Sequence, residues 1–281
     1  MKKILQLLFR EVLGTVAARV QRVTSAGFGA RRFFRKTWKP KSLNLGHTNR
    51  GFAAWGWETV DLAGADYNVD FRTGGIELPD GCCENIYSSH MIEHMDDESA
   101  MRVFREAHRV LQPGGVFRIV CPDLDRILQA YRENDVYFFM QAGSLVHSFV
   151  LNYVKTGAYP PEALQLHNHV VRSLASYADT GGGPIVEESE FLEHLANGSK
   201  YDFAKWCVSC LDPKRLTGSG CFGHVNAYAY DKLEGMLQEA GFRSISRCQP
   251  HQSASSFVCR QHFRRNEDRK AWISLYVEAV K

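Results

Sequence analysis

The sequence lacks a long apolar run. A membrane-spanning helix needs about 20 consecutive apolar residues, and the longest candidate, residues 4–20, is interrupted by Gln6, Arg10, Glu11 and Arg19. A secretory signal is missing too, because the short apolar stretch after Met1 runs directly into Arg10 and Glu11. The chain also has no internal repeat and no low-complexity tract. We therefore expect a cytoplasmic globular protein, in which the eight cysteines are reduced thiols.

The chain is long enough for one domain and an appendage. It has 281 residues, of which 44% are hydrophobic and 23% charged, and this suits one α/β domain of roughly 200–250 residues with an additional segment. We expect residues 1–41 to form that segment, an arm and linker, and residues 42–281 to form the domain.

Positive charge is concentrated at the N-terminal end. Residues 1–41 hold eleven Lys or Arg and one acid, whereas the rest of the chain holds 23 Lys or Arg and 30 acids. Residues 2–22 show a helical apolar period, which predicts an amphipathic helix. This basic arm has three interpretations: it lies on an anionic membrane surface, it packs on the domain or a partner, or it is an organelle transit peptide. Because the body of the chain is acidic, we expect no nucleic-acid partner.

The pattern along the domain predicts an α/β fold. Short apolar strands are expected at 42–46, 57–62, 67–71, 85–89, 116–121, 243–248 and 274–279. Helices are expected at 97–111, which ends before Pro113-Gly114-Gly115, and at 231–240, which ends at Gly241. Residues 126–219 break this alternation and predict a helical insertion before the last strands, where a lid or substrate pocket would sit.

Five short motifs carry a family resemblance. They are LNLG (43–46), GWETVDL (56–62), SSHMIEHM (88–95), LQPGG (111–115) and GHVNAY (223–228). Their combination resembles the class I S-adenosylmethionine-dependent methyltransferases, in particular the small branch of predicted methyltransferases called type 11. The resemblance implies a Rossmann-like, mostly parallel seven-stranded sheet with flanking helices, and S-adenosylmethionine as cofactor.

The resemblance also implies a cofactor edge on the carboxyl side of the sheet. A glycine after the first strand lets the backbone approach the ligand, and an acid after the second strand accepts the ribose hydroxyls. The implied cofactor-binding residues are Asn44, Gly46, Gly51, Asp61, Leu62, Asp70 and His90. This chain departs from the pattern at His47-Thr48, where the family has a small residue and a glycine.

Three polar residues are candidates for work on the methyl acceptor: His90, Asp123 and His224. A histidine suits proton removal near neutral pH, and Asp123 follows the fifth predicted strand. The alternatives are packing or hydrogen bonding at a helix start for His90, and capping of the following helix for Asp123.

Two patterns suggest zinc, but we predict no metal site. Residues 90–94 spell H-x-x-E-H, a zinc-peptidase pattern, yet His90 directly follows a strand and no third ligand is identifiable. Cys207, Cys210, Cys221 and His224 are also ligand types suited to zinc. Buried, inert thiols are the favoured interpretation of these cysteines.

We therefore expect an enzyme that transfers a methyl group to an oxygen or nitrogen of a small-molecule or glycan acceptor. Relatives of this branch occur beside polysaccharide and lipopolysaccharide synthesis, which favours a glycan, and membrane contact through the arm would suit a lipid-linked one. The alternatives are a non-catalytic binding protein that keeps the fold, favoured by Thr48, and a zinc-containing protein.

Overall fold

A computed structural model of the chain describes residues 42–47, 56–140, 165–175, 184–210, 223–256, 267–268 and 270–281. The chain divides into two units, residues 1–40 and 41–281, and all described residues belong to the second. The predicted amphipathic helix at 2–22 and the arm lie outside the described residues.

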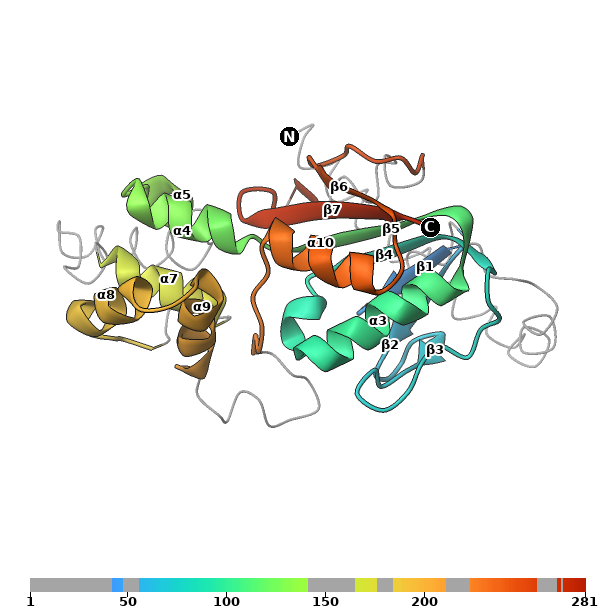
Figure 1. Cartoon of the computed structure of the whole chain (residues 1–281), viewed down its shortest axis with the longest axis horizontal. Coiled ribbons are helices and arrows are strands. Elements are labelled where there is room, and N and C mark those ends of the chain that lie inside the picture. Colours follow the sequence, from blue (N-terminus) through green and yellow to red (C-terminus); the bar gives the residue numbers. More distant parts are fainter. Residues whose placement is uncertain are drawn as a thin grey trace, which may run out of the picture. The chain divides into compact units, whose positions relative to one another are not determined.

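The second unit is built on a seven-stranded sheet with strand order β3-β2-β1-β4-β5-β7-β6 (Figure 1). The first five strands are parallel, and β7 runs antiparallel to both β5 and β6. Their bounds are β1 Ser42–Leu45, β2 Trp57–Asp61, β3 Tyr67–Asn68, β4 Cys83–Ser89, β5 Leu111–Pro122, β6 Ser244–Cys248 and β7 Ser274–Val280. The order reverses between β1 and β4, and ligands of open α/β sheets bind outside the strand ends at such a point.

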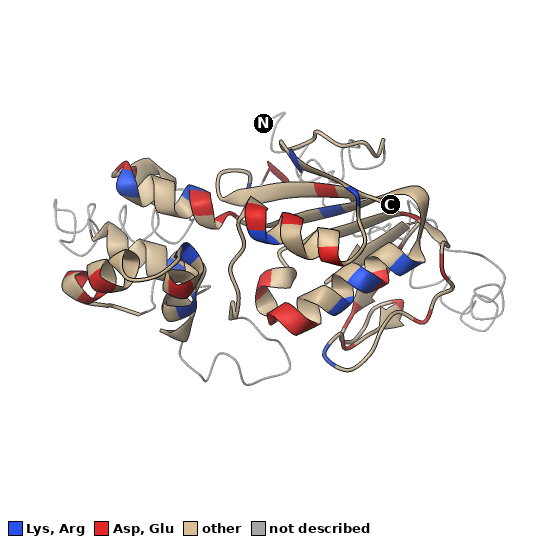
Figure 2. Cartoon of the chain, in the orientation of Figure 1, with Lys and Arg blue, Asp and Glu red and all other residues tan. Residues whose placement is uncertain are grey.

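Two amphipathic helices cover one face of this sheet, α3 (Asp97–Val110) and α10 (Tyr230–Glu239). Their apolar residues join alternate residues of the strands, such as Leu43 and Leu45, in one buried core. The side chain of Asp96 caps α3 by accepting from Ser99 N. Acids lie in the first turn of α3 and basic residues in its last turn, which complements the helix dipole (Figure 2).

The region after β5 is helical and has its own core. It contains α4 (Leu124–Arg132), α5 (Val136–Met140), α7 (Leu166–Leu174), α8 (Glu188–Ala196) and α9 (Lys200–Ser209). These helices group beyond the end of β5 (Figure 1), and residues such as Phe191, Val170 and Phe203 are buried among them. The predicted helical insertion is confirmed. His167 and His169 are buried in α7, because this helix packs against several others.

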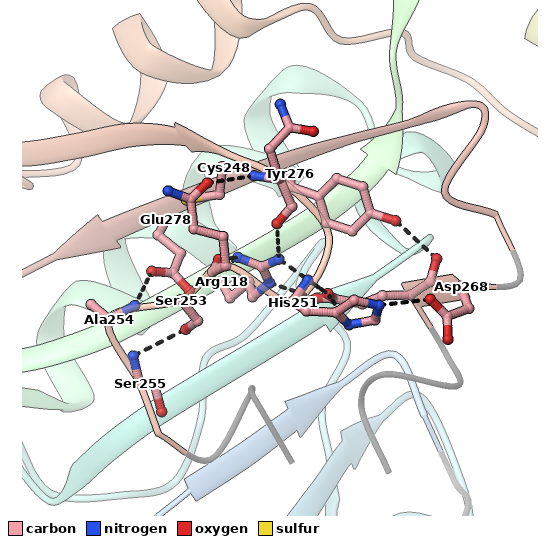
Figure 3. Close-up of polar contacts among 12 residues, drawn as sticks. Arg118, Cys248, His251, Ser253, Ala254, Ser255, Asp268, Tyr276 and Glu278 are labelled. Atoms are coloured by element: carbon pink, nitrogen blue, oxygen red, sulfur yellow. Dashed lines mark hydrogen bonds and ion pairs between the residues drawn. The ribbon is translucent and has the colours of Figure 1, made fainter. Parts of the chain in front are cut away.

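A buried ionic network joins the sheet to the segment after β6 (Figure 3). Arg118 of β5 is fully buried and donates to both carboxylate oxygens of Glu267, at 2.6 and 3.2 Å. It also donates to Glu278 at 3.1 Å and to the carbonyls of Gln249 and Gln252 at 3.1 and 2.8 Å. All five N–H donors of the guanidinium are therefore used.

The predicted fold class is confirmed, with shifts at the element ends. The third strand covers only Tyr67–Asn68, and the fifth is longer than predicted, Leu111–Pro122. Among the described residues, no helix is long and apolar enough to cross a membrane.

Candidate active site

The loop after β1 is tightly held at the switch point. Gly46 has φ +72°, a conformation that favours glycine, and its N–H donates to Val60 O at 2.8 Å. A Cβ at this position would lie 2.7 Å from Cβ of Met91, the second residue after β4. The loop therefore requires glycine both for its backbone conformation and for its packing.

Asp61 and Leu62 end β2 beside this loop. The Oδ1 atom of Asp61 accepts from Leu62 N at 2.7 Å, and Oδ2 has no partner among the described residues. The side chain of Asp61 is half-buried and that of Leu62 is 51% exposed. A carboxylate with an available oxygen and an exposed apolar neighbour suits a ribose and an adenine ring, so these residues fit the cofactor that the sequence predicts. His47 lies near Asp61: burial lowers the pKa of His47, and the Asp61 charge opposes this change.

The side chains of the other predicted cofactor residues differ in how many of their polar atoms are already hydrogen-bonded. Asn44 is buried in β1, and its amide nitrogen has no hydrogen-bond partner among the described residues. Asp70 lies in a turn after β3, where Arg72 binds both of its carboxylate oxygens at 2.9 and 2.7 Å. Hydrogen bonds from Arg72 lower the pKa of Asp70 to about 2, so an adenine amino group would compete with this pair. Gly51 lies outside the described residues.

His90 follows β4 directly and has a positive φ of 52°, which is uncommon outside glycine. Its Nε2 lies 3.1 Å from Ser274 Oγ, and its Nδ1 lies 3.0 Å from Glu93 Oε1. Because the Ser274 hydroxyl donates to the carbonyl of Lys270, Nε2 of His90 must donate to Ser274. Nδ1 then faces the Glu93 carboxylate, so His90 links Ser274 to Glu93.

Glu93 is the buried centre of this region. Its side chain is 2% exposed, and Oε2 has no hydrogen-bond partner among the described residues. Burial raises the pKa of Glu93, but the hydrogen bond and charge of His90, with smaller contributions from His224 and His94, outweigh it and lower the pKa to about 2. Glu93 is therefore ionised at neutral pH.

His94 and His224 meet beside Glu93. Their rings make an edge contact with centroids 5.0 Å apart, and one ligand atom from each of the three residues lies within 4.8 Å of the others. Val225 N and Asn226 N donate to the carbonyl of Glu93 at 2.9 and 3.1 Å, which fixes the segment of His224 against the short 3-10 helix η3 (Ile92–His94). Burial lowers the pKa of His224 to about 4, although the Glu93 charge opposes this.

Asp123 caps α4, as the structural alternative predicted. Its Oδ1 accepts from Asp125 N and Arg126 N at 3.1 and 3.4 Å, and its Oδ2 accepts from Arg247 at 2.6 Å. Burial raises the pKa of Asp123, and the charge of Arg247 opposes this. Both oxygens are thus engaged, and a catalytic function of Asp123 stays a prediction.

Among the described residues, the structure does not bring together all the ligands of either zinc pattern in the sequence. His90 and His94 belong to different elements, since His90 follows β4 and His94 ends η3. Cys207 is buried in α9, and its thiol pKa is raised by burial; Cys210 donates to Trp206 O at 3.4 Å. Among the described residues, these two cysteines join no group of three metal-ligand side chains with His224, and Cys221 lies outside the described residues.

The sequence missed two partners in the site. Ser274, which positions His90, is 184 residues away and starts an antiparallel strand. The carbonyl of Leu174 at the end of α7, which accepts from His224 Nδ1 at 3.0 Å, also gave no signal, because a main-chain acceptor can belong to any residue.

Comparisons with known proteins support a methyltransferase domain in the first half of the sheet. Residues 50–119 match a family model described as a methyltransferase domain, Methyltransf_11. No curated protein matches the chain significantly. A methyltransferase structure from Archaeoglobus fulgidus aligns at 12% identity over 90% of this chain and 92% of that one, with TM-score 0.36. One from Mesorhizobium loti aligns at 14% identity over 86% and 90%, with TM-score 0.37.

The domain match covers the part of the chain that carries three of the five motifs. Over residues 50–119 the chain is similar to a methyltransferase domain, and the strand order agrees with the Rossmann-like, mostly parallel sheet that the sequence predicts. The methyl acceptor is not defined by the family.

Proposed function

We propose that this domain transfers a methyl group from S-adenosylmethionine to a hydroxyl or amine of a small-molecule or glycan acceptor. The observation that carries the proposal is the gathering of polar groups at the carboxyl ends of β1, β2 and β4, at the switch point of the sheet. Bound S-adenosylmethionine supplies a methyl group already activated on a sulfonium, so the protein chiefly has to position two reactants.

On the cofactor side, Asp61 and Gly46 are the residues for which the structure gives the strongest support. Asp61 keeps one carboxylate oxygen available, and the backbone at Gly46 presents no side chain to a ligand. In this assignment, Asp61 accepts hydrogen bonds from the ribose hydroxyls of the cofactor. The cofactor also lies close to the backbone at Gly46.

On the acceptor side, His90 and His224 lie on the segments that surround Glu93. The helical insertion contributes to the same place, because Leu174 of α7 binds His224. In the proposed transfer, the acceptor oxygen or nitrogen bonds to the methyl carbon, the bond from carbon to sulfur breaks, and the acceptor's proton passes to a basic group of the site or to solvent. This contact between α7 and His224 supports a role of the insertion in choosing the acceptor.

The test is calorimetric titration of the full chain with S-adenosylmethionine and S-adenosylhomocysteine, beside Asp61→Asn and the control Asp80→Asn. Asp80 is an exposed acid that pairs with Arg109 away from the strand ends, so its replacement should leave affinity unchanged. We expect saturable binding that weakens at least tenfold in Asp61→Asn. Absence of binding by the native chain would contradict the proposal and favour a non-catalytic binding protein.

Acceptor class is then tested by following S-adenosylhomocysteine release with panels of sugars, glycans and small amines. Turnover only with hydroxyl acceptors would assign O-methylation, and turnover only with amines would assign N-methylation. Turnover with neither class would contradict this part of the proposal.

A second part of the proposal concerns the location of the protein in the cell. The charge of residues 1–41, eleven basic residues against one acid, supports a cytoplasmic protein with peripheral contact to anionic membranes. Co-sedimentation of the full chain with vesicles containing phosphatidylserine, compared with neutral vesicles, tests this. Equal sedimentation with both vesicle types would contradict it.

A further inference from the structure

Glu93, His94 and His224 form a converging group of metal-ligand types. One ligand atom of each lies within 4.8 Å of the other two, and Glu93 is buried. The three come from two segments, η3 and residues 223–228, which hydrogen bonds of the Glu93 carbonyl hold together. The relative position of these side chains is therefore fixed by main-chain structure.

Both histidines are oriented by their other ring nitrogen. Nδ1 of His94 donates to the carbonyl of Gly223 at 2.9 Å, and Nδ1 of His224 donates to the carbonyl of Leu174 at 3.0 Å. A carbonyl only accepts, so Nδ1 carries the hydrogen, and in the neutral ring Nε2 carries the lone pair. Hydrogen bonds of this kind orient the histidine ligands in most metal sites.

The remaining oxygen of Glu93 needs a partner that the described residues do not give. Oε2 is buried without a hydrogen bond, while Oε1 is taken by His90. A buried carboxylate oxygen without a partner is costly. A water molecule has only two hydrogens to offer to one carboxylate oxygen and two ring lone pairs, whereas one cation can bind all three.

We propose that Glu93, His94 and His224 bind a divalent transition-metal ion, with Zn²⁺ as the best match. Two imidazoles and one carboxylate are a common zinc ligand set, and three protein ligands leave one coordination position open. Ligand atoms around one zinc ion lie about 3.4 Å apart, so these side chains would close in by about an ångström. His224 then acts as a ligand and not as a general base.

This site differs from both zinc patterns in the sequence. It uses Glu93 and His94 of the H-x-x-E-H run but not His90, which is bonded to Glu93 and Ser274. It uses His224 of the cysteine pattern but neither Cys207 nor Cys210. The three proposed ligands come from both patterns, and neither sequence pattern contains all of them.

The test uses the full chain, stripped of metal with a chelator and then titrated with ZnCl2 by calorimetry. Glu93→Gln keeps an oxygen for His90, and His224→Asn removes the other segment's ligand. The matched control is His194→Asn, since His194 lies in α8 and stacks on Trp206. Circular dichroism and the unfolding midpoint in chelator show whether each variant is folded.

We expect one equivalent of Zn²⁺ per chain, binding at least about a hundredfold weaker in Glu93→Gln and His224→Asn, and unchanged binding in His194→Asn. Co²⁺ bound to the native chain should show visible bands without a thiolate charge-transfer band. Lack of Zn²⁺ binding by the native chain, unchanged affinity in both site variants, or a thiolate band would each overturn the proposal. Cofactor titrations do not enter this test, so its failure is distinguishable from failure of the methyltransferase proposal.

Discussion

The domain buries charge in two places that differ in how fully their polar atoms are bonded. Around Arg118, every guanidinium donor has an acceptor, and Glu267 and Glu278 also accept from main-chain N–H groups of His251 and Ala254. Around Glu93, one carboxylate oxygen has no hydrogen-bond partner among the described residues, and His94 and His224 lie beside this carboxylate. A fully bonded buried network stabilises one conformation, whereas an incompletely bonded one is a place for a ligand.

The position of each cluster agrees with this difference. Arg118 lies within β5 and ties the chain after β6 to the sheet (Figure 3). Glu93 lies just past the carboxyl end of β4, at the edge where ligands of such sheets bind. The comparison shows that burial of charge alone does not identify a functional site.

The largest predicted effect is on stability at the bonded cluster. Arg118→Met should lower the free energy of unfolding by about 3–5 kcal/mol, because it leaves two buried carboxylates without their cation. Urea denaturation measures this. Arg105→Met is the matched control, because Arg105 forms an exposed pair with Glu239 that contributes at most about 1 kcal/mol. Similar losses in the two variants would break the comparison.

The next prediction concerns Gly46, a site residue where glycine is required for steric reasons. Gly46→Ala should lower the free energy of unfolding by about 1–3 kcal/mol, through its positive φ and the clash with Met91. In a Met91→Ala background the added cost of Gly46→Ala should fall but not vanish, because the backbone strain remains. A double-mutant cycle measures the difference, and full additivity would show that the contact with Met91 is irrelevant.

Asp123 sharpens the comparison, because it is a fully bonded buried carboxylate at the same edge as Glu93. Asp123→Ala should cost about 1–2 kcal/mol through loss of the cap of α4. Asp123→Asn keeps the cap and should cost less. Both variants should bind S-adenosylhomocysteine as the native chain does, and a calorimetric loss of affinity in Asp123→Asn would show that Asp123 acts in cofactor binding and not only as a cap.

Much of the fold could be predicted from the sequence, because local patterns determine it. The apolar runs gave the strands, the period of Met101, Phe104 and Ala107 gave α3, and Pro113-Gly114-Gly115 gave its end. The end of β3 could not be predicted, since Val69 and Phe71 are buried by packing although they lie outside the strand.

The candidate site was predictable only in part. Gly46 and Asp61 follow strands and carry a local signal, and the structure places both at the predicted edge. His224 lies beside Glu93 and His94 because a segment about 130 residues further along the chain packs against η3. No local sequence pattern predicts such a contact. Short sequence spacing therefore does not predict this grouping.

The difference between the Arg118 and Glu93 clusters is tested most directly by thermal unfolding of the native chain and of Glu93→Gln, each in chelator and in excess Zn²⁺. We predict that in chelator Glu93→Gln is less stable than the native chain, but by less than Arg118→Met, because Gln keeps an oxygen for His90 and loses only the charge of that pair. Zn²⁺ should raise the midpoint of the native chain and leave that of the variant unchanged, since only a ligand that binds the folded state stabilises it. A loss in chelator as large as that of Arg118→Met, with no response of the native chain to Zn²⁺, would show that Glu93 is a structural residue and would contradict the account.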